Sequence, residues 1–90
     1  MTKNQFEQAY LKMPKNFMTP DIKKWKVIGI GEDMRVVELS QGQGFDGSDV
    51  WGVSEFKANN SNRYGLESTE RADLFKDEDK AYRYYLLLTN

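Results

Sequence analysis

The sequence contains neither cysteine nor histidine, so neither a disulfide nor a zinc site built from the usual ligands holds the fold together. A chain of 90 residues is near the lower limit for a domain that a single hydrophobic core stabilises. We therefore predict one domain over residues 1–90. Because 13% of the residues are aromatic, their rings must supply much of the buried area.

The same absence narrows the chemistry available to the chain. Histidine and cysteine supply most general bases that work at neutral pH, the thiolate nucleophile and the commonest zinc ligands. Acid/base catalysis would depend on carboxylates, and no spacing brings Glu38, Asp49 and Glu55 into a cleft. We predict a protein that is not an enzyme, with no catalytic residues, no metal site and no cofactor.

Two glycine-containing motifs favour ordinary turns over ligand sites. Gly29 and Gly31 lack the third glycine and the following helix of a dinucleotide-binding loop. Residues 46–49 are too few for an EF-hand loop and lack its terminal glutamate, so calcium binding is the weaker interpretation of their acidic side chains.

The first residues carry the signals of an amphipathic helix. Thr2 and Gln5 have the spacing of a capping box, and Pro14 ends the periodic segment. The apolar residues fall on one stripe: Phe6, Ala9, Tyr10 and Met13. We predict a helix over residues 3–13, followed by an irregular connector over 14–23 in which Thr19-Pro20-Asp21 is able to cap a short helical turn.

After the connector the hydrophobic period changes to two, which predicts strands. A tight turn at Gly31-Glu32-Asp33 predicts that the first two strands form a hairpin. Three glycines between residues 41 and 49 indicate a long loop, and residues 58–62 indicate another turn. The predicted strands are 25–30, 35–40, 50–57 and 63–68, the last with an interrupted extension toward Leu74.

The chain ends in a second amphipathic helix. Asp77 is its predicted N-cap. The apolar stripe that we expect to pack on the sheet is composed of Ala81, Tyr84, Tyr85 and Leu88. One sheet face cannot cover the additional apolar residues Tyr82, Leu86 and Leu87, so we expect these to contact a second copy in a homodimer. The predicted fold is α+β: an N-terminal helix, a three- to four-stranded antiparallel meander and a C-terminal helix on one sheet face, in two layers.

Charge is distributed unevenly along the chain. Residues 1–26 contain six lysines and two acidic residues, a net charge of +4, whereas residues 27–90 contain seven basic and twelve acidic residues, a net charge of −5. A lysine-rich segment with aromatic residues is typical of single-strand nucleic-acid binding. The candidate residues are Lys15, Lys23, Lys24, Trp25 and Lys26, although a sequence pI of 5.4 and the absence of arginine before residue 35 argue against this interpretation.

Two other segments favour a protein partner. Aromatic residues beside a glycine-rich loop are frequent interface anchors, and an acidic surface complements a basic one. The candidate contacts are Phe45, Asp46, Asp49 and Trp51 at the loop, and Glu70, Asp73, Asp77 and Glu78 on the acidic surface. We predict a non-enzymatic accessory or inhibitor that occupies a partner's surface, of the kind that phages and mobile elements encode, with a nucleic-acid-binding accessory as the alternative.

The sequence carries no membrane signal. No apolar run reaches the roughly 18 residues of a membrane span, and the first residues lack the apolar segment of a signal peptide. The absence of cysteine is typical of a reducing compartment, and we expect a cytoplasmic protein that does not contact a membrane.

Overall fold

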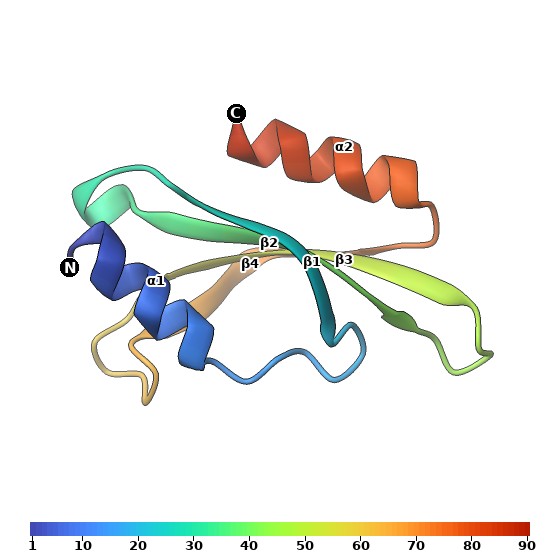
Figure 1. The fold of residues 1–90 in the computed structure, drawn as a ribbon, viewed down its shortest axis with the longest axis horizontal. Coiled ribbons are helices and arrows are strands. Elements are labelled where there is room, and N and C mark those ends of the chain that lie inside the picture. The colour runs from blue at the N-terminus through green and yellow to red at the C-terminus, as the bar shows by residue number, and fades with distance from the viewer.

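The computed structural model describes all 90 residues and shows a four-stranded antiparallel sheet with a helix on each face (Figure 1). The strands lie side by side in chain order: β1 (Asp21–Ile28), β2 (Arg35–Gln43), β3 (Asp49–Ala58) and β4 (Leu66–Phe75). The helices are α1 (Lys3–Lys12) and α2 (Glu78–Thr89), and a short 3-10 helix, η1 (Gly31–Asp33), joins β1 to β2. The predicted fold class is confirmed, with four strands and with α2 packed on the sheet. Neither helix combines the length and the apolar composition needed to cross a membrane.

Helix α1 begins at the predicted capping box. The backbone N–H of Gln5 donates to Thr2 Oγ1 at 3.1 Å, and the N–H of Thr2 donates to Gln5 Oε1 at 2.9 Å. Two residues one turn apart, Phe6 and Tyr10, are buried against the sheet. They form one core cluster with Met34, Val36 and Leu66.

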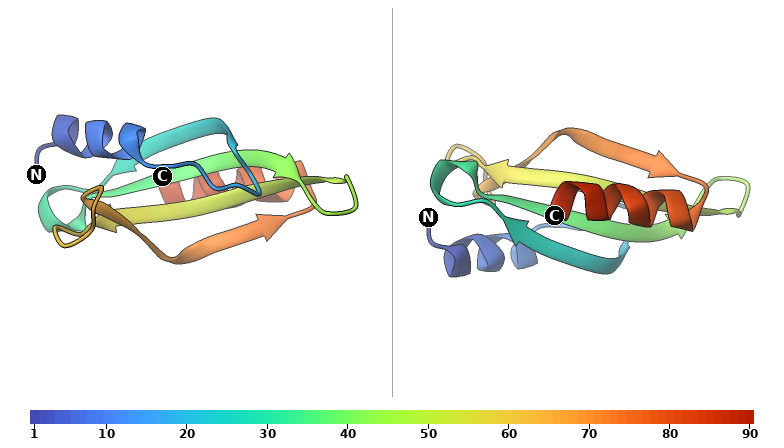
Figure 2. Two further views of the ribbon diagram at one scale, coloured as in Figure 1. Left: turned by 90° about the horizontal axis from the view of Figure 1, so that it is seen from below. Right: turned by 90° about the horizontal axis from the view of Figure 1, so that it is seen from above.

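Asp77 is the N-cap of helix α2, as predicted, and its side chain accepts hydrogen bonds from the backbone N–H groups of Asp79 and Lys80. Its buried residues Ala81 and Tyr85 form a second core cluster with Val37, Leu39 and Val53. Figure 2 shows the two helices on opposite faces of the sheet.

The central strand β2 explains why both faces are covered. Its residues alternate between the faces, so that Val36 packs beneath α1 and the next residue, Val37, packs beneath α2. A strand that is apolar on both faces needs cover on both. The sequence predicted that the C-terminal helix covers one sheet face, in two layers, and assigned no face to α1; in the structure α1 covers the other face, so the sheet lies between the two helices.

The predicted loop over residues 41–49 is shorter in the structure. Gln41 to Gln43 continue β2 and pair with the start of β3, so only residues 44–48 form the loop. Gly42 belongs to the strand because the connector crosses it: a Cβ atom at this position would lie 1.8 Å from the carbonyl oxygen of Met18. The glycine therefore marks a close approach of two backbone segments.

Other boundaries shift by a few residues. The connector ends at Pro20 without a helical turn, and β1 occupies Asp21–Ile28 because Gly29, with φ +76°, ends the strand. Strand β4 begins at Leu66 rather than at residue 63, and it continues to Phe75.

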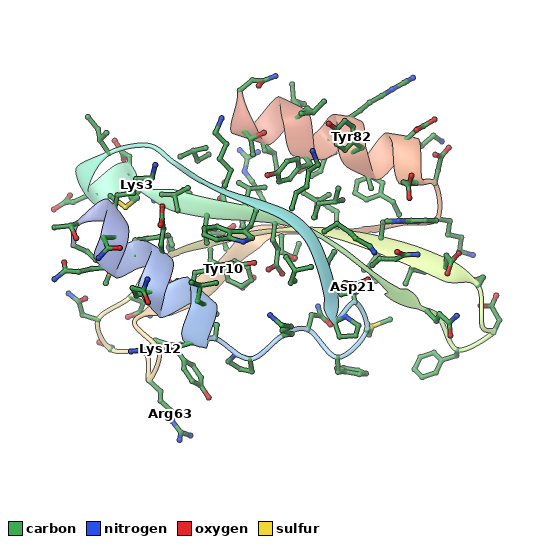
Figure 3. All side chains as sticks on the ribbon, viewed as in Figure 1. Lys3, Tyr10, Lys12, Asp21, Arg63 and Tyr82 are labelled. Atoms are coloured by element: carbon green, nitrogen blue, oxygen red, sulfur yellow. The ribbon has the colours of Figure 1, made fainter.

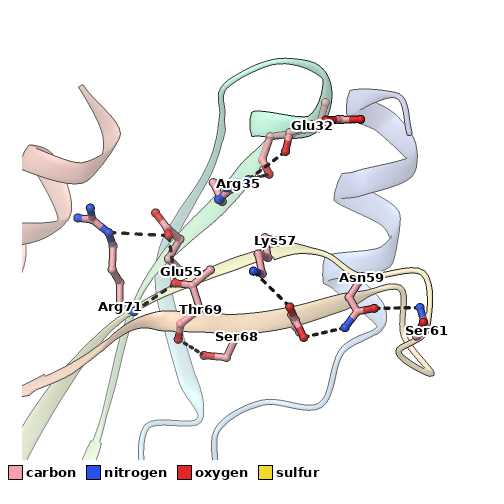
Figure 4. A network of polar contacts seen from close by, with 11 residues as sticks. Glu32, Arg35, Glu55, Lys57, Asn59, Ser61, Ser68, Thr69 and Arg71 are labelled. Atoms are coloured by element: carbon pink, nitrogen blue, oxygen red, sulfur yellow. Dashed lines mark hydrogen bonds and ion pairs between the residues drawn. The ribbon is translucent and has the colours of Figure 1, made fainter.

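Strand β4 contains a bulge opposite Glu55, where the register with β3 shifts between Ser54 and Phe56. The Glu55 carboxylate accepts a hydrogen bond from Thr69 Oγ1 at 3.0 Å and lies 3.9 Å from Arg71 Nε (Figure 4). A bulge and charged side chains are common devices that discourage further strands from adding to an open edge.

The meander brings several distant segments to one end of the sheet. Consecutive strands run in opposite directions, so the start of β1, the β2–β3 loop (44–48) and the β4–α2 turn (76–77) lie together. We term this the loop end; in Figure 1 the loop and the start of α2 lie at the right. The 3-10 helix and the β3–β4 turn lie at the opposite end.

Candidate protein-binding surface

The loop end collects most of the residues predicted to bind a partner. The β2–β3 loop and the start of β3 supply four of them, Phe45, Asp46, Asp49 and Trp51, and the end of β4 with the start of α2 supplies three, Asp73, Asp77 and Glu78. Glu70 lies apart from these, in the bulge of β4. Two candidate sets that are separate in the sequence therefore lie at one end of the fold.

Phe45 occupies the tip of a loop that is fixed by its own hydrogen bonds. Asp46 Oδ1 accepts from the backbone N–H of Ser48 at 3.0 Å and from its hydroxyl at 2.6 Å, and the N–H of Gly44 donates to the carbonyl of Ser48 at 2.8 Å. The Ser48 hydrogen bonds hold the pKa of Asp46 below its usual range. The Phe45 side chain is 99% exposed although its backbone is constrained.

Phe17 is a second exposed aromatic residue, one that the sequence did not indicate as a protein contact. It is 84% exposed and lies in the connector between two fixed points. On one side, Asn16 Oδ1 accepts from the N–H of Met18 at 2.9 Å. On the other, Thr19 is buried, and its Oγ1 accepts from the Ser40 hydroxyl at 2.9 Å.

The two phenyl groups border one hollow. Phe17 and Phe45 line it from the connector and the loop, together with Met18, Gln43 and Gly44. Acidic residues lie around it: Asp46 follows Phe45, and Asp21 and Asp49 line an adjoining hollow that also includes Phe17. Only Asp21 of these three forms an ion pair, with Lys23 at 2.7 Å. We term Phe17 and Phe45 the phenyl pair.

A further hollow lies on the α2 face of the loop end. Trp51 and Tyr82 line it with Leu39, and the charged residues at its border are Lys23, Lys24, Glu78 and Asp79. The Lys24 ammonium lies 5.2 Å from the centroid of the Tyr82 ring. Trp51 is half-buried and also packs against the core cluster beneath α2, so this predicted contact residue has a structural role as well.

The residues proposed for nucleic-acid binding are divided between the two faces. Trp25 packs on the α1 face, with its ring 5.1 Å from that of Tyr10. On the α2 face, Lys26 Nζ donates to the carbonyl of Thr89 at 3.4 Å, and Lys24 lies over Tyr82. Of the remaining two, Lys23 pairs with Asp21, and Lys15 lies on the α1 face beside Glu38. The geometry does not join them into one basic surface.

Glu38 is a buried carboxylate beneath α1. The Tyr10 hydroxyl donates to its Oε2 at 2.5 Å, and burial raises the pKa of Glu38 while the Tyr10 hydrogen bond and the nearby Lys15 charge oppose the rise (Figure 3 labels Tyr10). Burial also raises the pKa of Tyr10. Glu38 pairs with Ser54 in the sheet, so Glu55 lies on the opposite face and the two carboxylates do not converge. No group of three or more acidic side chains is arranged to hold a metal ion.

The residues predicted to form a homodimer line the solvent side of α2. Leu87 is 73% exposed, whereas Tyr82 and Leu86 are nearer one-third exposed. The homodimer stays a prediction, which sedimentation of the wild type and of Leu87→Glu would test.

The most exposed aromatic residues of the chain thus lie together at an end of the fold that also carries acidic side chains. Comparison of the chain with protein-family models, with curated proteins and with solved structures finds no match.

Proposed function

We propose that the chain is a non-enzymatic protein-binding module, an accessory or inhibitor that occupies its partner's surface through the phenyl pair. The observation that carries this proposal is the exposure of Phe17 and Phe45, 84% and 99%, beside the same hollow. A small domain depends on its aromatic rings for core area, yet these two rings contribute none. Contiguous exposed apolar groups of this kind mark interaction sites.

The fixed backbone around each ring supports a binding role. Burying a phenylalanine side chain contributes roughly 1.5 to 3 kcal/mol, so both rings together supply roughly 3 to 6 kcal/mol to an interface. The turns at Asn16 and Asp46 hold the backbone before a partner arrives. Association therefore loses less conformational freedom than it would with flexible loops.

The charges around the phenyl pair indicate the partner's chemistry. Asp46 and Asp49 flank Phe45 and form no ion pairs within the chain. Electrostatic complementarity then favours a protein surface that has an apolar hollow for the rings and basic side chains at its border. Surfaces that bind nucleic acid belong to this class.

The test compares variants in capturing a partner from a lysate of the organism that encodes the chain. Phe17→Ser/Phe45→Ser removes the phenyl pair, and Ile30→Ser/Tyr64→Ser replaces two exposed apolar residues at the opposite end of the sheet. Because all four side chains are at least one-third exposed, we expect both double variants to stay folded by circular dichroism. The wild type and the control should retain one protein that Phe17→Ser/Phe45→Ser loses; equal capture by all three would refute the proposal.

A further inference from the structure

We propose that the hollow on the α2 face of the loop end binds an arginine side chain of the protein partner, and that Lys24 occupies this site in the free protein. We term it the cation hollow; its lining is Leu39, Trp51, Tyr82, Lys23, Lys24, Glu78 and Asp79. This inference rests on the proposed function, because it assumes a protein partner, and it names the chemistry of a second contact.

Two aromatic side chains give the cation hollow its preference for positive charge. Tyr82 extends from α2, labelled in Figure 3, and Trp51 comes from β3. The face of an aromatic ring attracts a cation that lies within about 6 Å of its centroid. Lys24 Nζ lies 5.2 Å from the centroid of Tyr82, so this ring already accepts a cation from the same chain.

Two carboxylates without ion-pair partners border the same hollow. Glu78 and Asp79 are the first residues of α2, and both are exposed. The acidic members of the four ion pairs in the structure are other residues, Glu7, Asp21, Glu55 and Glu67. An incoming cation therefore finds acceptors that the fold does not already use.

Lys24 has the properties of a displaceable occupant. Lys24 is exposed and forms no ion pair, and its ammonium lies over the Tyr82 ring instead. The neighbouring Lys23 is held by Asp21 at 2.7 Å, so it does not compete for the rings. Lys24 lies on the edge strand β1, and its long side chain is able to leave the Tyr82 ring when another cation binds there.

Arginine suits this hollow better than lysine does. Its guanidinium is planar, stacks on aromatic faces and presents paired N–H donors that match a carboxylate. The cation hollow offers both kinds of contact, because the rings of Trp51 and Tyr82 line it and the carboxylates of Glu78 and Asp79 stand at its border. The cation hollow lies on the α2 face, whereas the connector that carries Phe17 crosses β2 at Gly42 on the α1 face, so a partner that contacts both must extend around the loop end.

The experiment is a titration of the folded protein followed by NMR. The probe is N-acetyl-arginine methylamide, and its neutral counterpart is the corresponding citrulline compound, which keeps the shape without the charge. The readout is the indole N–H signal of Trp51, distinguished from that of Trp25 through the variant Trp25→Phe. We expect the arginine compound to shift this signal with a millimolar Kd and the citrulline compound to leave it unchanged.

Three variants test the assigned roles. Lys24→Met removes the resident cation and should tighten arginine binding by about fivefold. Lys12→Met makes the same change of net charge on α1, away from the hollow, and should change the Kd less than twofold. Tyr82→Leu should weaken binding below detection.

Equal shifts from both compounds, or equal effects of Lys24→Met and Lys12→Met, would overturn the inference. The variant Phe17→Ser/Phe45→Ser separates the two proposals, because it should abolish partner capture while leaving the arginine titration unchanged. If the arginine titration shows no binding while the capture experiment succeeds, the inference about the cation hollow is refuted and the proposed function is not.

Discussion

Replacement of Tyr10 by phenylalanine removes the hydrogen bond that holds α1 to the buried carboxylate of the sheet. Tyr10 is 8% exposed and Glu38 is 5% exposed, and their oxygens lie 2.5 Å apart. The structure gives the Glu38 side chain no other hydrogen bond. A hydrogen bond to a charged group contributes about 1.5 to 3 kcal/mol, and the ring packing is kept, so Tyr10→Phe should lower the free energy of unfolding by about 2 kcal/mol at pH 7.

The loss in free energy of unfolding caused by Tyr10→Phe should depend on pH. Burial raises the pKa of Glu38, so the folded state binds this proton more readily than the unfolded state does. The stabilisation that comes from this tighter proton binding by Glu38 is fully present below pH 4.5, the ordinary pKa of a glutamate. It is lost as the pH rises through the raised pKa of the folded state. The Tyr10 hydroxyl favours the ionised form, and its removal raises the pKa of Glu38 further. Tyr10→Phe should therefore cost less at about pH 4 than at about pH 7.

Urea unfolding of four proteins at both pH values measures this effect: wild type, Tyr10→Phe, Glu38→Gln and the double variant. Tyr84→Phe is the matched control, because its half-buried ring packs on Phe75 and its hydroxyl forms no hydrogen bond. The control should change stability by less than about 0.5 kcal/mol. A Tyr10→Phe cost equal to that of the control, or one that does not vary with pH, would refute the role of the pair.

Three further predictions concern the connector, the α2 cap and nucleic acid. Gly42→Ala places a Cβ atom 1.8 Å from the Met18 carbonyl oxygen, so it should destabilise the fold by roughly 1 to 3 kcal/mol or more. A thermal melt measures this loss, and an unchanged melting temperature would mean that the connector does not cross β2 closely. Asp77→Ala removes the N-cap of α2 and should cost about 1 kcal/mol, with the exposed Asp73→Ala as a neutral control; equal costs would contradict the capping role. Fluorescence anisotropy with single- and double-stranded DNA at two salt concentrations should show no binding below millimolar protein, because the lysines are divided between two faces, and salt-dependent binding would favour the nucleic-acid alternative.

The features that sequence predicts well are those whose partners are near in the chain. Thr2 and Gln5 are three residues apart, and Asp77 accepts hydrogen bonds from the backbone N–H groups two and three residues later, so spacing alone identifies both helix starts. The hairpin of β1 and β2 follows for the same reason, because a short connection, residues 29–34 with η1, joins two alternating segments.

Features that depend on distant contacts did not follow from the pattern. Gly42 indicates a loop in sequence, and it belongs to a strand because Met18, far away in the chain, crosses over it. Glu38 has the sequence character of a surface residue, and it is buried because Tyr10 supplies a donor from another element. Phe17 lies among lysines in the sequence, and only the burial of Thr19 beside it shows that the connector is fixed there.

Site-specific photo-crosslinking tests the central claim, that the loop end binds a protein, most directly. A benzophenone amino acid replaces Phe17, Phe45 or, as the control at the opposite end of the sheet, Tyr64, and each protein is illuminated in a lysate of the organism that encodes it. We predict that positions 17 and 45 crosslink to one and the same protein and that position 64 does not. Crosslinking to that protein from position 64 alone, or equally from all three positions, would contradict the account.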